Sequence, residues 1–229
     1  MKTTIIKIAT AEVSLLTFAQ NGFCLGFVNL DFESAQIIPI TGGPYINSIA
    51  TTNALPGWTV LYGSSQQSVI SYNDPALGST FVTLIATNGS QLAGNYSVLL
   101  QGGETASAAT ISQTGLVPAS AESLTFLAVG DAPYPYEPDL QVLLGGQDLT
   151  FSAISNELNY TLYGANISTF ADQMETLSFS APEATSGYNN WEIDNIQFSS
   201  SPVPEPGTLA LAILGGLFIV RRCCRKLPT

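Results

Sequence analysis

From residue 27 to residue 198 the chain alternates short apolar/polar runs with clusters of Gly, Pro, Asn, Ser and Asp. Successive side chains of a β-strand point to opposite faces, so this period-two alternation is typical of half-buried strands. Runs of this kind, bounded by turn residues, are typical of all-β domains. We therefore expect about a dozen strands, over residues 27–33, 58–62, 68–72, 80–85, 96–100, 109–113, 123–129, 140–144, 147–154, 159–163, 176–180 and 191–198.

The turn residues between these runs predict the structure of two connections. Gly145-Gly146 between two strand-like runs is a two-residue hairpin signal. Residues 131–139 contain three prolines, so they form an exposed loop and not a central strand. One short helix is expected at most, over residues 167–175, and no internal repeat is present. The sequence thus predicts one all-β domain, an antiparallel β-sandwich of jelly-roll type.

Charge is distributed very unevenly along the chain. No Lys, Arg or His occurs from residue 8 to residue 220, whereas 15 of the 17 acidic residues remain in the body once Glu12 and Glu205 are set aside. A body without cations cannot neutralise phosphates, which excludes nucleic acid as a partner. Its carboxylates must be solvated, bonded to backbone N–H groups or paired with bound cations, and Ca²⁺ is the natural cation for oxygen ligands.

Catalytic residue types are scarce. Cys24, Cys223 and Cys224 lie near the chain ends, so the body has neither a disulfide framework nor Cys or His ligands for zinc. Without His, Lys, Arg or Cys, nucleophile–base arrangements are absent. A pair of carboxylates acting as a glycoside hydrolase is the one catalytic alternative. We expect a protein that is not an enzyme.

The first 26 residues are typical of a signal peptide, with Lys2 and Lys7 ahead of a moderately apolar run that Glu12 interrupts. Cleavage after Ala19 and cleavage after Gly26 both satisfy the small-residue rule. We expect the chain to be exported across the inner membrane.

The end of the chain combines three features in order: Val-Pro-Glu-Pro at 203–206, an uncharged apolar run at 207–220, and a basic cluster. An apolar helix can cross lipid, and the cations after it stay on the cytoplasmic side. Fourteen residues give about 21 Å of helix against a hydrocarbon core of about 30 Å, which suits a transient transmembrane anchor. The residues that define this pattern are Pro204, Glu205, Pro206, Arg221 and Arg222.

This tail resembles the PEP-CTERM sorting signal of bacterial exported proteins. The resemblance implies transient anchoring in the membrane and processing by an exosortase-like protease, followed by release to the cell surface or the extracellular space. The expected organisation is a signal peptide at 1–26, a β-sandwich at 27–198, a flexible linker at 199–202 and the sorting signal at 203–229.

The first and last runs of the body, 28–34 and 191–196, resemble the ends of galactose-binding-like jelly rolls and carbohydrate-binding modules. In those modules the terminal strands pair, and acidic residues near them hold a structural Ca²⁺ ion. Carried over by position, the resemblance implies Glu33 and Asp194 as calcium ligands, with Asp31 as a weaker candidate.

Sugar binding requires aromatic faces that stack on sugar C–H groups. Tyr134 and Tyr136, in the proline-stiffened loop, are the candidates for a ligand-binding site, whereas Trp58 and Trp191 are expected in the core. The sequence therefore predicts an exported, non-catalytic protein of the cell envelope or exopolysaccharide matrix that binds glycan. The alternatives are a self-associating structural protein, a carboxylate-based glycoside hydrolase, and an ice-binding protein, although the flat, regular Thr-rich face that ice binding needs is missing.

Overall fold

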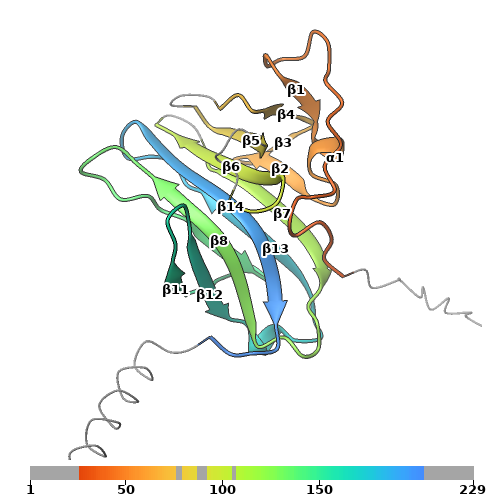
Figure 1. Cartoon of the computed structure of the whole chain (residues 1–229), viewed down its shortest axis with the longest axis vertical. Coiled ribbons are helices and arrows are strands. Elements are labelled where there is room, and N and C mark those ends of the chain that lie inside the picture. Colours follow the sequence, from red (N-terminus) through yellow and green to blue (C-terminus); the bar gives the residue numbers. More distant parts are fainter. Residues whose placement is uncertain (1–25, 76–78, 87–91, 105–106, 204–229) are drawn as a thin grey trace, which may run out of the picture.

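Two β-sheets stacked face to face make up the body (Figure 1). The computed structural model describes residues 26–75, 79–86, 92–104 and 107–203. The larger sheet has eight strands in the order β1 (Ser48–Ala50), β4 (Val69–Tyr72), β5 (Phe81–Ala86), β6 (Tyr96–Gly103), β14 (Tyr188–Ser199), β8 (Ser123–Asp131), β12 (Thr161–Asn166) and β11 (Phe151–Asn156). The smaller has six, in the order β10 (Gln147–Asp148), β9 (Gln141–Leu144), β13 (Met174–Ala181), β7 (Ala109–Leu116), β2 (Thr59–Tyr62) and β3 (Ser65–Gln67).

Nearly all strand pairs are antiparallel; β4 and β5 pair in parallel. Helical structure within the described ranges is limited to α1 (Thr51–Ala54) and a 3-10 turn, η1 (Ser168–Phe170). None of the helices there is long and apolar enough to cross a bilayer. The expected transmembrane run at 207–220 lies outside the described residues.

The core lies between the two sheets. Phe126 of β8 and Phe179 of β13 are fully buried, with ring centroids 5.1 Å apart in an edge-to-face arrangement. Edge-to-face aromatic pairs contribute about 0.5–1.5 kcal/mol beyond the burial of their surface. Trp58 and Trp191 are 5% and 6% exposed, which confirms that both belong to the core.

Every run expected as a strand from residue 58 onward contains a strand. The run 147–154 is divided into β10 and β11, which belong to different sheets. Leu149, between them, is buried, and its N–H donates to Val142 at 2.8 Å, so the chain crosses the edge of the core there. The Gly145-Gly146 hairpin is confirmed, since both residues have positive φ (61° and 74°), as the tight turn requires.

The prediction of a strand over residues 27–33 is wrong. Asn29 and Phe32 have left-handed φ values of 50° and 58°, so the segment forms turns. These turns direct Phe32 fully into the core against Trp58, whose indole N–H donates to the Asn29 carbonyl at 2.9 Å. The segment still reaches the last strand, because Ile196 N–H donates to the Leu30 carbonyl at 3.0 Å.

The expected helix over residues 167–175 is also largely absent. Only η1 is helical, and β13 begins at Met174. The short elements β1, β3 and α1 lie outside all the expected runs, because three or four residues are too few to show a period.

The long strands give the sandwich two distinct ends. At the attachment end, defined by residues 26, 116–123, 168–174 and 199–203, Gly26 bridges Leu116 and the N–H of Glu122 donates to Ser199 at 2.8 Å. At the far end, defined by residues 103–104, 107–109, 131–139 and 182–190, Gly103 pairs with Tyr188 and Asp131 with Asn190. Both ends of the described chain therefore leave the body from the attachment end, on opposite sides of it in the view of Figure 1.

Candidate functional site

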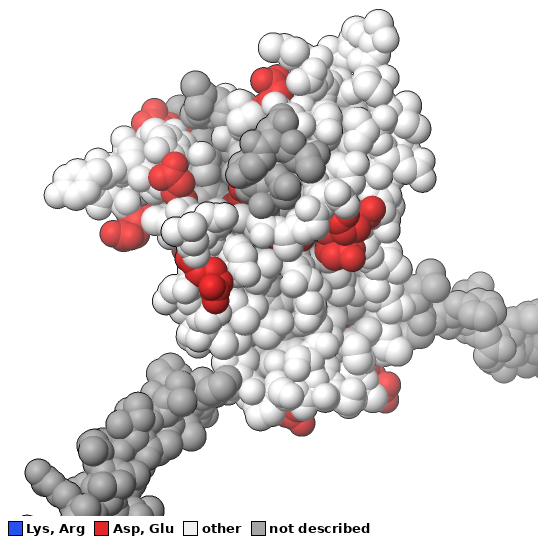
Figure 2. All heavy atoms as spheres, viewed as in Figure 1, with Lys and Arg blue, Asp and Glu red and all other residues white. Residues whose placement is uncertain are grey.

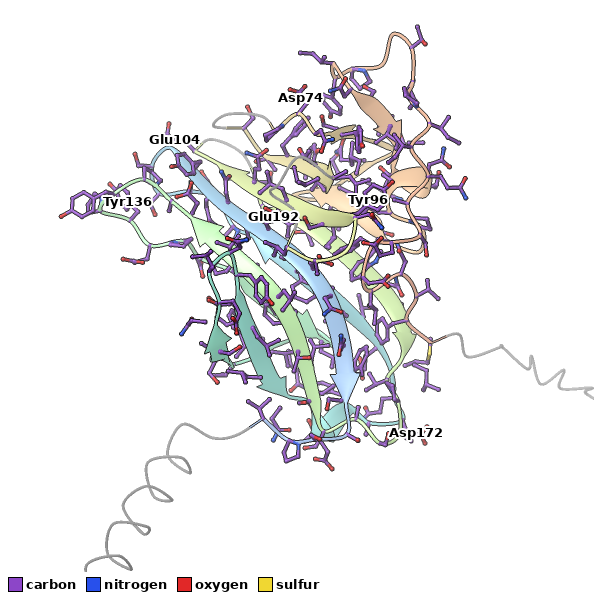
Figure 3. The ribbon with its side chains drawn as sticks, in the orientation of Figure 1. Asp74, Tyr96, Glu104, Tyr136, Asp172 and Glu192 are labelled. Carbon is purple, nitrogen blue, oxygen red and sulfur yellow. The ribbon has the colours of Figure 1, made fainter. Side chains whose placement is uncertain are left out.

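The loop between β8 and β9 carries the predicted ligand-binding tyrosines at the far end. Tyr134 is 97% exposed and Tyr136 is 43% exposed. The N–H of Tyr136 donates to the carbonyl of Pro133 at 2.9 Å, which closes a turn inside the loop. Figure 3 shows Tyr136 at one extremity of the body and Asp172 at the other. The structure therefore brings both tyrosines together on one projecting loop.

The base of this loop is held by a buried amide. Asn189 of β14 is 5% exposed. Its Oδ1 accepts from the N–H of Asp139 at 3.0 Å, while its Nδ2 donates to the carbonyls of Asp139 at 2.8 Å and Pro182 at 3.1 Å. Each of these bonds satisfies a group that would otherwise be desolvated and unpaired. Asn189 thus joins the loop to β14 and to the 182–187 connection.

Close packing braces the loop from the other side. A Cβ atom on Gly130 would lie 2.8 Å from Cγ of Pro138 and 2.8 Å from Cζ2 of Trp191. Real Cβ atoms do not approach that closely, so Pro138 and Trp191 occupy the space that a side chain at residue 130 would take. The exposed tyrosines therefore project from a rigid support.

A small groove opens on the outer face of the eight-stranded sheet beside the loop. Its volume is about 160 Å³, and its lining residues are Leu99, Val129, Gly130, Asp131, Asn190 and Glu192. In the sheet register Glu192 lies between Leu99 and Val129, and Asn190 lies opposite Asp131. Aliphatic side chains therefore flank two carboxylates and an amide, and Asp131 belongs both to the groove and to the start of the loop.

Burial perturbs the groove carboxylate Glu192. Desolvation raises its pKa to about 6, although a hydrogen bond from the Ser97 hydroxyl opposes the rise. The negative charge of Asp131, which lines the groove, also raises the pKa of the partly buried Tyr188. Figure 2 shows the acidic side chains of this face in separate groups, with no Lys or Arg among them.

The predicted calcium ligands Glu33 and Asp194 both bond to the segment that leads into β6. Glu33 accepts from the N–H of Asn95 at 2.6 Å, from its Nδ2 at 2.7 Å and from the N–H of Tyr96 at 3.1 Å. Asp194, 1% exposed, accepts from the N–H groups of Ala93 at 2.8 Å and Asn195 at 2.6 Å. Both carboxylates therefore accept hydrogen bonds from the backbone of residues 93–96 or of the adjacent Asn195.

The pKa values of these two carboxylates move in opposite directions. Burial raises that of Asp194 to about 7, with hydrogen bonds from Asn195 and Ala93 opposing and the charges of Glu33 and Glu192 adding to the rise. For Glu33, burial raises the pKa, but the hydrogen bonds from Asn95 and Tyr96 outweigh it and leave the pKa below its usual value. Glu33 is therefore ionised at neutral pH, whereas the carboxyl group of Asp194 gains or loses its proton near pH 7.

Asp31, the weaker calcium candidate, is exposed and accepts from the N–H of Glu33 at 3.3 Å. Within the part of the chain that the structure describes, no group of three or more His, Cys, Asp or Glu side chains is arranged to hold a metal ion. The calcium site stays a prediction, which a titration must test.

Several functional candidates were not identified from the sequence. Asn189, Asn190 and Glu192 were missed, although the alternation through Trp191 could have indicated which of them face outward. An apolar pocket of about 320 Å³ was missed as well; it is lined by Ile37, Pro39, Ile40, Ile46, Asn47, Ser48, Ile49, Tyr72 and Asn73. Five of these nine residues come from the irregular 37–47 segment, which shows no sequence period.

Comparison with known families matches residues 202–226 to the PEP-CTERM protein-sorting motif. This motif indicates a secreted, surface-sorted protein with a C-terminal anchor that exosortase, a membrane protease, processes. The match includes the predicted sorting residues Pro204, Glu205, Pro206, Arg221 and Arg222, which lie outside the described residues. No curated protein matches the chain.

Proposed function

We propose that this exported, surface-sorted protein is a non-catalytic jelly roll that binds glycan at its far end. The observation that carries the proposal is the exposure of Tyr134 on a loop that Asn189 and the Trp191–Pro138 packing hold rigid. A preorganised aromatic face loses little conformational entropy on binding. Such a face can stack on the C–H groups of a sugar ring.

The path of the chain supports the jelly-roll assignment and its resemblance to carbohydrate-binding modules. From β6 onward the chain crosses repeatedly between the sheets: β7, β9, β10 and β13 belong to the six-stranded sheet, and β8, β11, β12 and β14 to the eight-stranded one. Only the pairs β9–β10 and β11–β12 stay within one sheet. Consecutive strands that cross between two packed sheets are typical of Greek-key sandwiches.

The groove supplies the polar half of a sugar site. Asp131, Glu192 and Asn190 offer hydrogen-bond acceptors and an amide donor to hydroxyl groups, while Leu99 and Val129 offer aliphatic contact. The groove has no cation and the body is acidic, so an anionic polysaccharide would be repelled. The ligand we propose is therefore an uncharged extracellular polysaccharide.

Two features support a role without catalysis. The groove volume of about 160 Å³ is below the roughly 300–1,000 Å³ of usual small-molecule sites. From residue 27 to residue 198 there is also no His, Lys, Arg or Cys to serve as a base or nucleophile partner. Asp131 and Glu192 are the pair that a glycoside hydrolase would use, so release of reducing ends from a bound glycan would indicate an enzyme instead.

The test is a glycan array probed with the full-length chain in mild detergent. We expect binding to neutral polysaccharide fragments that Tyr134→Ala/Tyr136→Ala abolishes. Leu158→Ala is the matched control, because Leu158 is 98% exposed but lies outside the loop. Unchanged binding by the double variant would refute the site.

Self-association as a matrix protein is the second candidate function. Edge strand β11 pairs on one side with β12, and Ile154 within it and Leu158 just after it are 39% and 98% exposed. Exposed apolar edge strands promote pairing with another chain. Sedimentation that shows oligomers of the wild type and monomers of Leu158→Glu would favour this function.

A structural Ca²⁺ ion at Glu33 and Asp194 is part of the proposal. Its presence requires a rise in melting temperature with added Ca²⁺ that Glu33→Ala abolishes and Asp31→Ala preserves. An unchanged melting temperature in millimolar Ca²⁺ would remove the ion from the account.

A further inference from the structure

Residues 199–203, which lead into the sorting motif, lie against the body. The Ser123 hydroxyl donates to the carbonyl of Ser201 at 2.7 Å, and the N–H of Glu122 donates to the carbonyl of Ser199 at 2.8 Å. The N–H of Ser201 donates in turn to the hydroxyl of Ser199 at 3.0 Å. The segment is therefore attached to the start of β8.

Apolar contact continues this attachment to the last described residue. A Cβ atom on Gly164 would lie 2.8 Å from Cγ2 of Val203 and 2.6 Å from Cδ1 of Ile154. Both side chains therefore cover the backbone of β12 at Gly164. Val203 is partly buried, and it lies inside the matched sorting motif, which begins at residue 202.

The reach of the chain beyond Val203 is short. Residues 204–206 separate it from the expected apolar run, which begins at Gly207. Four Cα–Cα steps span at most about 14 Å when fully extended. A membrane protease that holds the motif while the segment stays attached must therefore lie within about 14 Å of Val203, which is closer than the thickness of a small domain.

We propose that the attachment end of the body is a docking surface for the membrane protease that processes the sorting motif. The surface is formed by the exposed turn Pro118-Ala119-Ser120 and by the attached residues 199–203. The partner is the protease and not the lipid, because a body without cations gains nothing from an anionic lipid surface.

This docking also fixes the orientation of the anchored protein. Strand β8 begins at Ser123, which holds Ser201, and ends at Asp131, where the tyrosine loop starts. Nine residues of strand give a separation of about 26 Å. The far end therefore points away from the membrane before processing, as the opposite positions of Tyr136 and Asp172 in Figure 3 indicate.

The experiment inserts the same small folded domain at either end of the full-length chain and follows processing in exporting cells by pulse-chase. Insertion between Ala119 and Ser120 should slow processing at least tenfold. A flexible 20-residue spacer between Ser201 and Pro202 should restore the rate, since it moves the protease away from the obstruction. Insertion between Thr185 and Ser186, at the far end but outside the tyrosine loop, should leave the rate unchanged.

Each outcome decides the proposal. Equal rates for the two insertions would overturn it, and so would a slow Ala119/Ser120 variant that the spacer fails to rescue, because a misfolded body would behave that way. These results are independent of glycan binding, which the array measures separately.

Discussion

The buried carboxylate of Asp194 accepts a hydrogen bond from the backbone N–H of Ala93 at 2.8 Å. This bond ties the last strand, β14, to the segment that leads into β6, 101 residues earlier in the chain. Glu33 holds the same segment two residues further on, through Asn95 and Tyr96. Two carboxylates thus join three distant parts of the sequence.

The pKa values of Asp194 and Glu192 predict that the protein loses stability as pH rises. Burial raises both pKa values, to about 7 for Asp194 and about 6 for Glu192, above the usual values of 3.8 and 4.5. Between pH 4 and pH 7 the folded state retains protons that the unfolded state has released, so the free energy of unfolding falls with pH. We expect a slope of roughly 1 kcal/mol per pH unit between pH 5 and pH 7, measured by urea unfolding.

The matched variant for this prediction is Asp194→Asn, which cannot ionise. Its unfolding free energy should depend less on pH between 5 and 7, and Glu192→Gln should remove a further part of the slope. A slope that is the same in the wild type and in both variants would show that other groups cause it.

Glu33→Ala should destabilise the protein by about 1–3 kcal/mol, because three N–H donors on Asn95 and Tyr96 lose their charged acceptor. Since the pKa of Glu33 is lowered, its stabilisation is present above the unfolded pKa and is lost as pH falls through the lower folded pKa. Thermal unfolding at pH 7 and pH 3 measures both effects.

Asp31→Ala is the control for Glu33. Asp31 is exposed and has one long hydrogen bond to the Glu33 N–H, so we expect a change within about 0.5 kcal/mol. A loss as large as that of Glu33→Ala would mean that the turn itself, and not the bonds to Asn95 and Tyr96, is the stabilising element.

Asn189→Ala should weaken both stability and glycan binding. The variant removes three hydrogen bonds and leaves two carbonyls and one N–H near Asp139 and Pro182 without a partner, at a cost of about 1–3 kcal/mol. Because the tyrosine loop loses its support, affinity should fall even where the variant is fully folded. Urea unfolding and glycan titration at a temperature well below the transition separate the two effects.

Asn156→Ala tests whether the loss of any side-chain amide lowers the affinity for glycan. Asn156 is exposed on β11, and its Oδ1 accepts from Thr161 at 3.0 Å, away from the loop. Its affinity for glycan should match the wild type. Equal losses in both variants would contradict a specific role for Asn189.

Strand positions were largely predictable from the sequence, since long half-buried strands such as β8 and β14 repeat every two residues. The 27–33 segment shows the same period but folds as turns, in which the left-handed backbone at Asn29 and Phe32 places the Phe32 ring in the core against Trp58. A two-residue period in the sequence therefore does not by itself distinguish a strand from a segment of turns.

Only one part of the candidate site, the tyrosine loop, could be predicted from the sequence, because its proline content indicates an exposed loop. Three prolines marked the tyrosine loop correctly, and its exposure is confirmed at Tyr134. The bracing of the loop by Asn189 depends on a contact 50 residues distant in sequence, and the groove depends on the register of β6, β8 and β14. Contacts between residues so far apart in the chain produce no local pattern in the sequence.

The most direct test of the account is the affinity of the full-length chain for a neutral polysaccharide fragment identified on the array, measured by calorimetry. We predict that Tyr134→Ala/Tyr136→Ala lowers the affinity at least tenfold while Leu158→Ala leaves it within twofold of the wild type. Equal affinity in the wild type and the double tyrosine variant would contradict a glycan site at the far end of the sandwich.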